Sequence, residues 1–120
     1  MAVRSYQDLE VWQRAMELAV ESYRLTRRMP GRELYALVSQ IQRAAASVPA
    51  NIAEGHGRSR GDYVRHLTIA NGSLRQLESH LILVEHLDYT GGEELRRARA
   101  LIARVGQMLV ALMQRLRRRD

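Results

Sequence analysis

The strongest constraint on the fold is a helical period that runs through four segments of similar length. Apolar residues recur in steps of three and four, a spacing that places them on one face of an α-helix. The segments cover about residues 7–29, 32–56, 59–88 and 93–117, and short glycine-containing stretches separate them. Three short connections between helices of equal length predict an all-α fold, an antiparallel up-down-up-down four-helix bundle that forms a single domain over residues 1–120.

Capping residues and apolar stripes refine this prediction. Ser5 with Asp8, and Ser59 with Asp62, form Ser-x-x-acid capping patterns, and Pro30-Gly31 ends the first helix. Leu, Ala, Arg, Glu, Gln and Met, which favour helix, make up 70 of the 120 residues. The predicted buried stripes are Leu9, Trp12, Met16, Ala19, Tyr23 and Thr26; Leu34, Leu37, Val38, Ile41, Ala45, Val48 and Ile52; Tyr63, Leu67, Ala70, Leu74, Leu77, Leu81 and Val84; and Leu95, Ala98, Ile102, Val105, Leu109, Leu112 and Leu116.

Pro49 lies inside the second segment, where it removes a backbone donor and collides with the carbonyl of Ala45. The apolar period continues in phase through Ile52, which favours a kink near Pro49. A break into two helices is the alternative.

Further apolar residues lie beside the predicted stripes. They serve either a broad core face or a subunit interface, and the sequence leaves both interpretations open. These residues are Val11, Leu18 and Leu25; Ile69, Ile82 and Leu83; and Leu101, Met108 and Met113.

The sequence lacks the usual signatures of catalysis and cofactor binding. There is no Cys, and no acid stands three residues before a His, as a di-iron bundle requires. The four His show no metal-ligand clustering, and His66, four residues after Asp62, is interpreted as a surface contact. The glycine-rich stretch 55–61 matches neither phosphate-loop pattern, and Ser47 and Ser73 lack a nucleophile elbow. We expect no enzyme activity, no metal and no cofactor.

Apolar runs are also too short for a membrane span, which needs about 18 residues, and the N-terminus lacks an apolar signal core. A cytoplasmic protein without membrane contact is therefore expected.

Residues 40–57 read QIQRAAASVPANIAEGHG. This segment resembles the hallmark of the four-helix-bundle proteins encoded by intervening sequences in bacterial 23S rRNA genes. Residues 8–13 (DLEVWQ) with Ala15, and 69–74 (IANGSL) with 77–78 (LE), resemble the first and third helices of that family. The family is distantly similar to the accessory protein of diversity-generating retroelements, a basic homopentameric ring that binds nucleic acid and a reverse transcriptase. The resemblance implies a homo-oligomer, with a pentamer as one candidate, and an RNA or DNA partner without catalysis.

The hallmark also has a physical interpretation. Its polar residues step by three or four along the second segment and face polar residues of the third. We expect an interhelix hydrogen-bond network that fixes the register around Pro49, with Gly55 and Gly72 allowing close backbone approach. The predicted network is Gln40, Arg43, Ser47, Asn51, Glu54, Ser73 and Glu78.

The net charge of +6 is unevenly distributed, and all 19 basic residues are Arg. Residues 58–66 hold three Arg and one acid, and residues 115–120 hold four Arg and one acid. In an up-down bundle these two segments meet at one end, a geometry that suits phosphate contacts. The predicted nucleic-acid-binding residues are Arg58, Arg60, Arg65, Arg97, Arg104, Arg115, Arg117, Arg118 and Arg119.

Two alternatives to this interpretation stay open. The arginines could serve only helix-dipole complementation and solubility. The protein could instead be a structural oligomer or an adaptor that docks a protein such as a reverse transcriptase on the same face.

Overall fold

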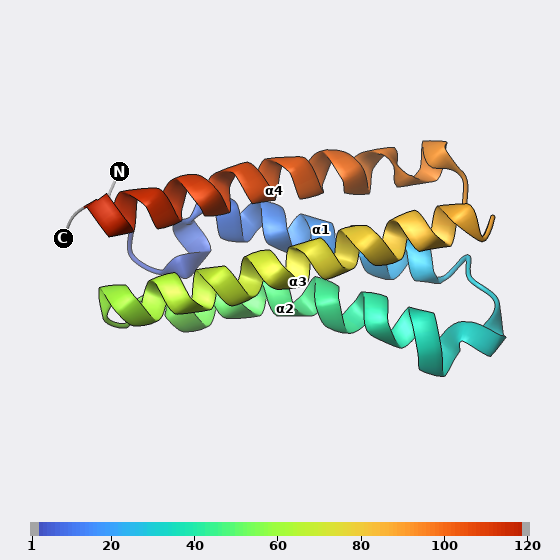
Figure 1. Ribbon diagram of the computed structural model, residues 1–120, viewed down its shortest axis with the longest axis horizontal. Helices are drawn as coiled ribbons and strands as arrows, with labels where there is room; N and C mark the ends of the chain where they lie inside the picture. Colours follow the sequence, from blue (N-terminus) through green and yellow to red (C-terminus); the bar gives the residue numbers. More distant parts are fainter. Residues whose placement is uncertain (1–2, 119–120) are drawn as a thin grey trace.

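The computed structural model describes residues 3–118. It is an all-α bundle of α1 (Glu10–Thr26), α2 (Ser39–Gly55), α3 (Arg60–His86) and α4 (Gly92–Arg118), with no strand in the described range. Successive helices run in opposite directions along a body of 47 × 25 × 22 Å (Figure 1). The start of α1, the C-terminal end of α4 and the α2–α3 turn therefore lie at one end of the molecule, and the α1–α2 and α3–α4 connections lie at the other (Figure 1).

Both predicted capping patterns are present. The amide of Asp62 donates to Ser59 Oγ at 3.3 Å and opens α3. Ser5 and Asp8 form a complete capping box, but it caps a separate 3₁₀ turn at Tyr6–Asp8, and α1 begins only at Glu10.

The second predicted segment is helical from Gly31 onward but not uniformly α. A 3₁₀ turn at Gly31–Glu33 leads into a π-helical turn at Leu34–Val38 before α2. Helix α2 is continuous through the buried Pro49, so the alternative of two separate helices is wrong. The kink at Pro49 stays a prediction.

One cluster of buried side chains from all four helices forms the core. The predicted stripe of α3 is buried throughout, and so are the predicted residues of the second segment from Leu37 onward and of α4 up to Leu109. Leu34, which precedes α2, is half exposed. Leu112 and Leu116 are partly buried and pack against the core.

The stripe predicted for α1 is confirmed only in part. Ala19 and Thr26 are buried, and Leu9 and Trp12 pack against the core, but the other two predicted residues do not. Met16 and Tyr23 are 38% and 43% exposed, whereas Val11, Leu18 and Leu25, assigned to a second line, are in the core. Helix α1 carries two apolar lines, and periodicity alone does not choose between them. The observed rotation also turns Glu10 and Glu17 of α1 toward α4, where they pair with arginines.

The other additional apolar residues divide between two environments. On α4, Leu101 and Met113 are buried and Met108 packs against the core, so the core face of this helix is broad. On α3, Ile69, Ile82 and Leu83 remain 42–44% exposed.

Candidate nucleic-acid interface

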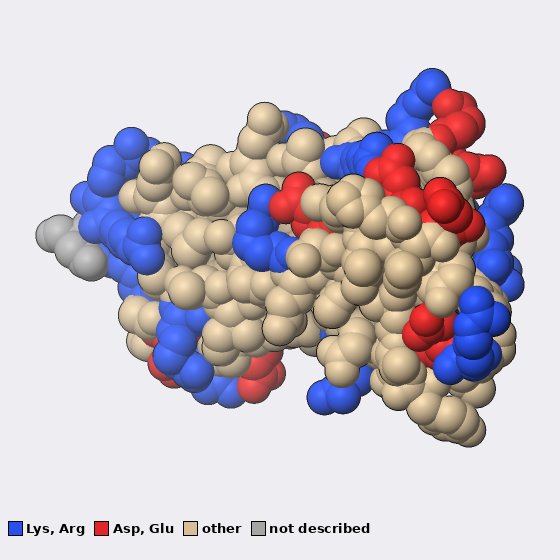
Figure 2. All heavy atoms as spheres, turned by 45° about the vertical axis from the view of Figure 1, so that its right-hand side comes forward, with Lys and Arg blue, Asp and Glu red and all other residues tan. Residues whose placement is uncertain are grey.

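The bundle brings two arginine-rich segments to one end of the molecule. The α2–α3 turn and the C-terminal end of α4 lie there together (Figure 1). In the space-filling view, basic side chains gather at the left-hand end, and further basic side chains lie among acidic ones at the right-hand end (Figure 2). We call this set the Arg-rich end: Arg58, Arg60, Arg65, Arg115, Arg117 and Arg118.

Two members of the Arg-rich end contact acidic side chains nearby. Arg58 pairs with Glu54 at 2.7 Å and lies 3.7 Å from Asp62, and Arg65 lies 3.5 Å from Asp62. Arg65 also contacts the Nε2 atom of His66 at 3.3 Å. The guanidinium side chains in these pairs are about half exposed, and such pairs contribute about 0–1 kcal/mol. A phosphate can therefore replace these carboxylates at little cost.

The end of α4 holds the arginines with the least compensation. Arg115, Arg117 and Arg118 form no ion pair with any residue of 3–118 and are exposed. Burial raises the pKa of Tyr63, and the positive charge of Arg115 acts in the opposite direction, which places Arg115 near the first turns of α3. Arg119, also predicted to bind, lies outside the described residues.

Arg97 and Arg104 have a different environment, although both were predicted to bind nucleic acid. Arg97 pairs with Glu17 of α1 at 3.2 Å, and Arg104 pairs with Glu10 at 3.3 Å. These pairs link α4 to α1 along the side of the bundle. Arg97 is 18 residues before Arg115, about 27 Å along the helix, so it does not belong to the Arg-rich end.

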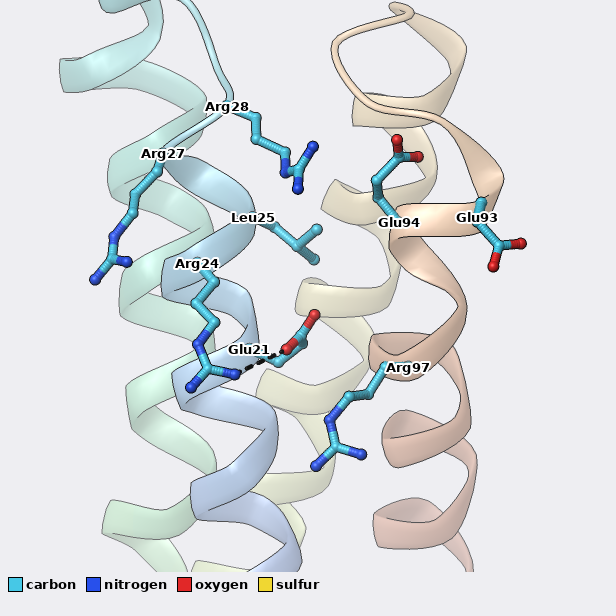
Figure 3. Close-up of a pocket in the computed structure, with 8 residues that line it drawn as sticks. All are labelled: Glu21, Arg24, Leu25, Arg27, Arg28, Glu93, Glu94 and Arg97. Atoms are coloured by element: carbon cyan, nitrogen blue, oxygen red, sulfur yellow. Dashed lines mark ion pairs between the residues drawn. The ribbon is translucent and has the colours of Figure 1, made fainter.

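Arg97 instead lines a pocket at the opposite end, between the end of α1 and the start of α4 (Figure 3). This pocket mixes charges: an ion pair of 3.6 Å joins Arg24 to Glu21, and Glu93 and Glu94 contribute to the lining from α4. The acids reduce its attraction for phosphate, so it is a poorer candidate site than the Arg-rich end.

The predicted polar network exists in a smaller form. The hydroxyl oxygens of Ser47 and Ser73 are 2.8 Å apart and join α2 to α3. The Asn51 amide donates to the carbonyl oxygen of Ser47 at 2.9 Å and to its hydroxyl at 3.0 Å. Glu54 and Glu78 do not take part, because they point outward and pair with Arg58 and Arg75.

Two further predicted members, Gln40 and Arg43, are exposed and line a shallow pocket beside the two serines. They make no hydrogen bond or ion pair within residues 3–118.

His66 is the network member that sequence reasoning missed. It is 8% exposed, and its Nδ1 atom lies 3.1 Å from Asn51 Oδ1. Because the Asn51 amide nitrogen already donates to Ser47, its oxygen is the acceptor and His66 Nδ1 is the donor. His66 Nε2 then accepts from Arg65, so the surface-contact interpretation of His66 is wrong. The seven-residue spacing from His66 to Ser73 was the available signal, since it places both on one side of α3.

Gly55 explains how α3 comes so close to α2 at this point. A Cβ atom at Gly55 would lie 2.7 Å from the Cβ of His66, so only glycine fits the observed spacing. Gly72 was expected to have the same role, but it faces solvent, and a Cβ atom there would meet no other atom within 4 Å. Of these two glycines, only Gly55 allows the close approach of α2 and α3.

Two further features concern the described part of the chain as a whole. Within residues 3–118, no group of three or more His or acidic residues is arranged to hold a metal ion. None of the helices in this range combines the length and the apolar composition that a membrane crossing needs.

Comparisons with known proteins agree with this architecture. The search of curated proteins finds no match. A crystal structure described as a protein of unknown function from the S23 ribosomal protein family of Bacteroides thetaiotaomicron VPI-5482 superposes with a TM-score of 0.76. It is 23% identical, and the alignment covers 86% of this chain and 97% of that one, a likeness that shows the fold. Residues 7–111 match the family described as 23S rRNA-intervening sequence protein, and the chain belongs to that family.

Proposed function

We propose that this protein is a non-enzymatic homo-oligomer that binds RNA or DNA through the Arg-rich end, in the cytoplasm. The observation that carries the proposal is the cluster of Arg115, Arg117 and Arg118, exposed and without ion pairs in residues 3–118, next to the arginines of the α2–α3 turn. Guanidinium groups bind phosphate oxygens in a bidentate manner.

Contacts to the phosphate backbone dominate the proposed binding. Only 5% of the residues are aromatic, and Tyr63, whose hydroxyl senses the charge of Arg115, is buried. Few rings are therefore available to stack on bases, and we expect weak sequence selectivity and strong salt dependence.

The exposed apolar side chains support the homo-oligomeric part of the proposal. Met16, Val20 and Tyr23 of α1 and Ile69, Ile82 and Leu83 of α3 are each 38–47% exposed. A second copy that covered such surfaces would remove them from water. A pentamer is the stoichiometry that the family resemblance implies, and it would repeat the Arg-rich end in every subunit.

The test measures fluorescence anisotropy of labelled single-stranded RNA and DNA over a range of salt concentrations. The triple variant Arg115→Gln/Arg117→Gln/Arg118→Gln removes three charges, and Arg24→Gln/Arg27→Gln/Arg28→Gln removes three at the opposite end as a matched control. We expect the first variant to lower the salt slope by about 2 to 3 units and the control to change it little. If both variants change the salt dependence of the affinity equally, or if the affinity does not depend on salt, the Arg-rich end is not the binding surface.

A protein partner, such as a reverse transcriptase, is the second candidate. Tyr35 is 93% exposed and Leu34 is 50% exposed, both in the π-helical turn before α2 at the end opposite the Arg-rich end. Light scattering after size-exclusion, with and without RNA, separates the two candidates. An oligomer whose mass does not change with RNA favours the adaptor or a structural oligomer.

A further inference from the structure

A shallow pocket between α2 and α3 lies outside the Arg-rich end. Its volume is about 310 Å³, and it opens above the hydrogen bond that joins Ser47 to Ser73. Its lining belongs to the hallmark segment and to the facing side of α3: Gln40, Arg43, Ala44, Ser47, Ser73 and Gln76.

The charge of this pocket is positive and uncompensated. Arg43 is exposed and forms no ion pair or hydrogen bond with residues 3–118, and no acid is among the lining residues. Arg75, Arg97 and Arg104, in contrast, each have a carboxylate partner. Arg43 therefore keeps its full set of donors available to a ligand.

The serine pair adds a further donor. Ser47 and Ser73 carry two hydroxyl hydrogens, and the bond between their oxygens uses one. Ser47 Oγ also accepts a hydrogen bond from Asn51, which leaves the second hydroxyl hydrogen without an acceptor in residues 3–118. Since both serines line the pocket, a ligand oxygen there can accept that hydrogen.

Two carboxamides complete the set. Gln40 and Gln76 approach the pocket from α2 and α3, and neither side chain makes a hydrogen bond within residues 3–118. The pocket thus combines one guanidinium, one hydroxyl donor and two amide groups with no carboxylate. This combination suits a small group that carries several acceptor oxygens and negative charge.

We propose that this pocket binds a phosphate group, with Arg43 as the charge partner and Gln40, Gln76 and the serine pair as hydrogen-bonding partners. The phosphate comes either from a nucleic-acid backbone or from free phosphate, and both sources share this chemistry. The polar network then contributes to this site, because the hydrogen bonds from Asn51 hold Ser47 in position at the pocket. The site does not depend on nucleic-acid binding at the Arg-rich end.

The first experiment follows the side-chain amide signals of Gln40 and Gln76 by nitrogen-15 NMR of the full chain during a titration with inorganic phosphate. Sodium chloride of equal ionic strength is the reference. We expect saturable shifts with a Kd on the order of 1 mM. The shifts should disappear in Arg43→Gln, an exposed substitution that breaks no internal bond. They should persist in Arg27→Gln, which removes one exposed charge on the residue that follows α1. Phosphate shifts no larger than those caused by chloride, or equal in both variants, would overturn the proposal.

A second arm identifies the source of the phosphate. Binding of a short oligouridylate is measured by anisotropy for the same two variants. If Arg43→Gln loses more affinity for the oligouridylate than Arg27→Gln does, the pocket binds a backbone phosphate. If both variants bind the oligouridylate equally and the phosphate shifts still depend on Arg43, the pocket binds free phosphate. If the Arg115/Arg117/Arg118 variant loses its salt-dependent binding of nucleic acid, but phosphate causes no shifts in the wild type, the phosphate pocket is refuted and the proposed function is kept. If phosphate causes Arg43-dependent shifts but the protein binds no nucleic acid, the phosphate pocket is supported and the proposed function is refuted.

Discussion

Gly55 is the position where the structure makes its sharpest quantitative prediction. Adding a methyl group in Gly55→Ala would place a Cβ atom 2.7 Å from the Cβ of His66 and 3.0 Å from Cδ1 of Tyr63. The His66 Cβ is fixed to the backbone of α3, so α2 and α3 have to separate by several tenths of an ångström. Overpacking of this kind costs about 1–3 kcal/mol.

Part of this cost is offset, because Ala loses less backbone entropy than Gly on folding, by about 0.4–1 kcal/mol. The net expectation for Gly55→Ala is a loss of about 1–2 kcal/mol in the free energy of unfolding. A loss of this size lowers the Tm of a 120-residue domain by roughly 3–10 °C.

Gly72→Ala provides the matched control, because Gly72 lies within α3 and a Cβ there meets no atom within 4 Å. Only the entropic and helix-propensity gain applies, so we expect it to stabilise the protein by about 0.5–1 kcal/mol. Urea denaturation of both variants, followed by circular dichroism, gives the two free energies. A Gly55→Ala protein as stable as the wild type, or stabilised like Gly72→Ala, would refute the close approach of α2 to His66.

Three other changes test the polar network and its surroundings. Tyr63→Phe removes a buried hydroxyl that has no hydrogen-bond partner in residues 3–118, so unfolding at neutral pH should show unchanged or up to about 1 kcal/mol higher stability. Burial raises the pKa of Tyr63 above its ordinary value of 10.0, so the stability that neutral Tyr63 provides is complete below pH 10.0 and falls as the pH rises further. In urea titrations at alkaline pH, the wild type should therefore lose stability relative to Tyr63→Phe. Parallel dependence of both stabilities on pH would contradict this expectation. Asn51→Leu removes the hydrogen-bond acceptor of His66 and two hydrogen bonds to Ser47, so the free energy of unfolding should fall by about 1–3 kcal/mol. Light scattering should show impaired assembly before RNA affinity changes. Normal assembly with lost RNA binding would argue for a ligand role of Asn51 instead. Pro49→Ala restores a backbone hydrogen-bond donor inside a continuous α2, so circular dichroism should show unchanged or higher helix content. A loss of helix content would mean that α2 requires the proline to keep its geometry.

Sequence periodicity was sufficient to predict the four helices and most of their buried faces. Helix α3 shows this best, because its apolar line from Tyr63 to Val84 is strict and every predicted member is buried. The hallmark segment also pointed to the contact between α2 and α3, because Ser47, Asn51 and Ser73 are polar groups at positions that face a neighbouring helix.

The rotation of α1 depends on tertiary packing, because that helix has two apolar lines of similar strength. The line with Val11 and Leu18 is buried, and the pairs Glu10–Arg104 and Glu17–Arg97 lie across the α1–α4 seam. A helical period measures the spacing of residues within one helix and contains no information about which neighbours that helix meets.

The candidate sites divide in the same way. The sequence located the excess of arginine, but only the packed helices separate Arg115, which has no ion pair in residues 3–118, from Arg97 and Arg104, which pair with α1. His66 entered the network for the same reason: its burial depends on Gly55 of another helix, 11 residues away in the chain. The charge of each residue and the spacing of apolar residues can be read from the sequence. The pairing of each charge with an opposite charge, and the burial of each side chain, depend on which helices pack together.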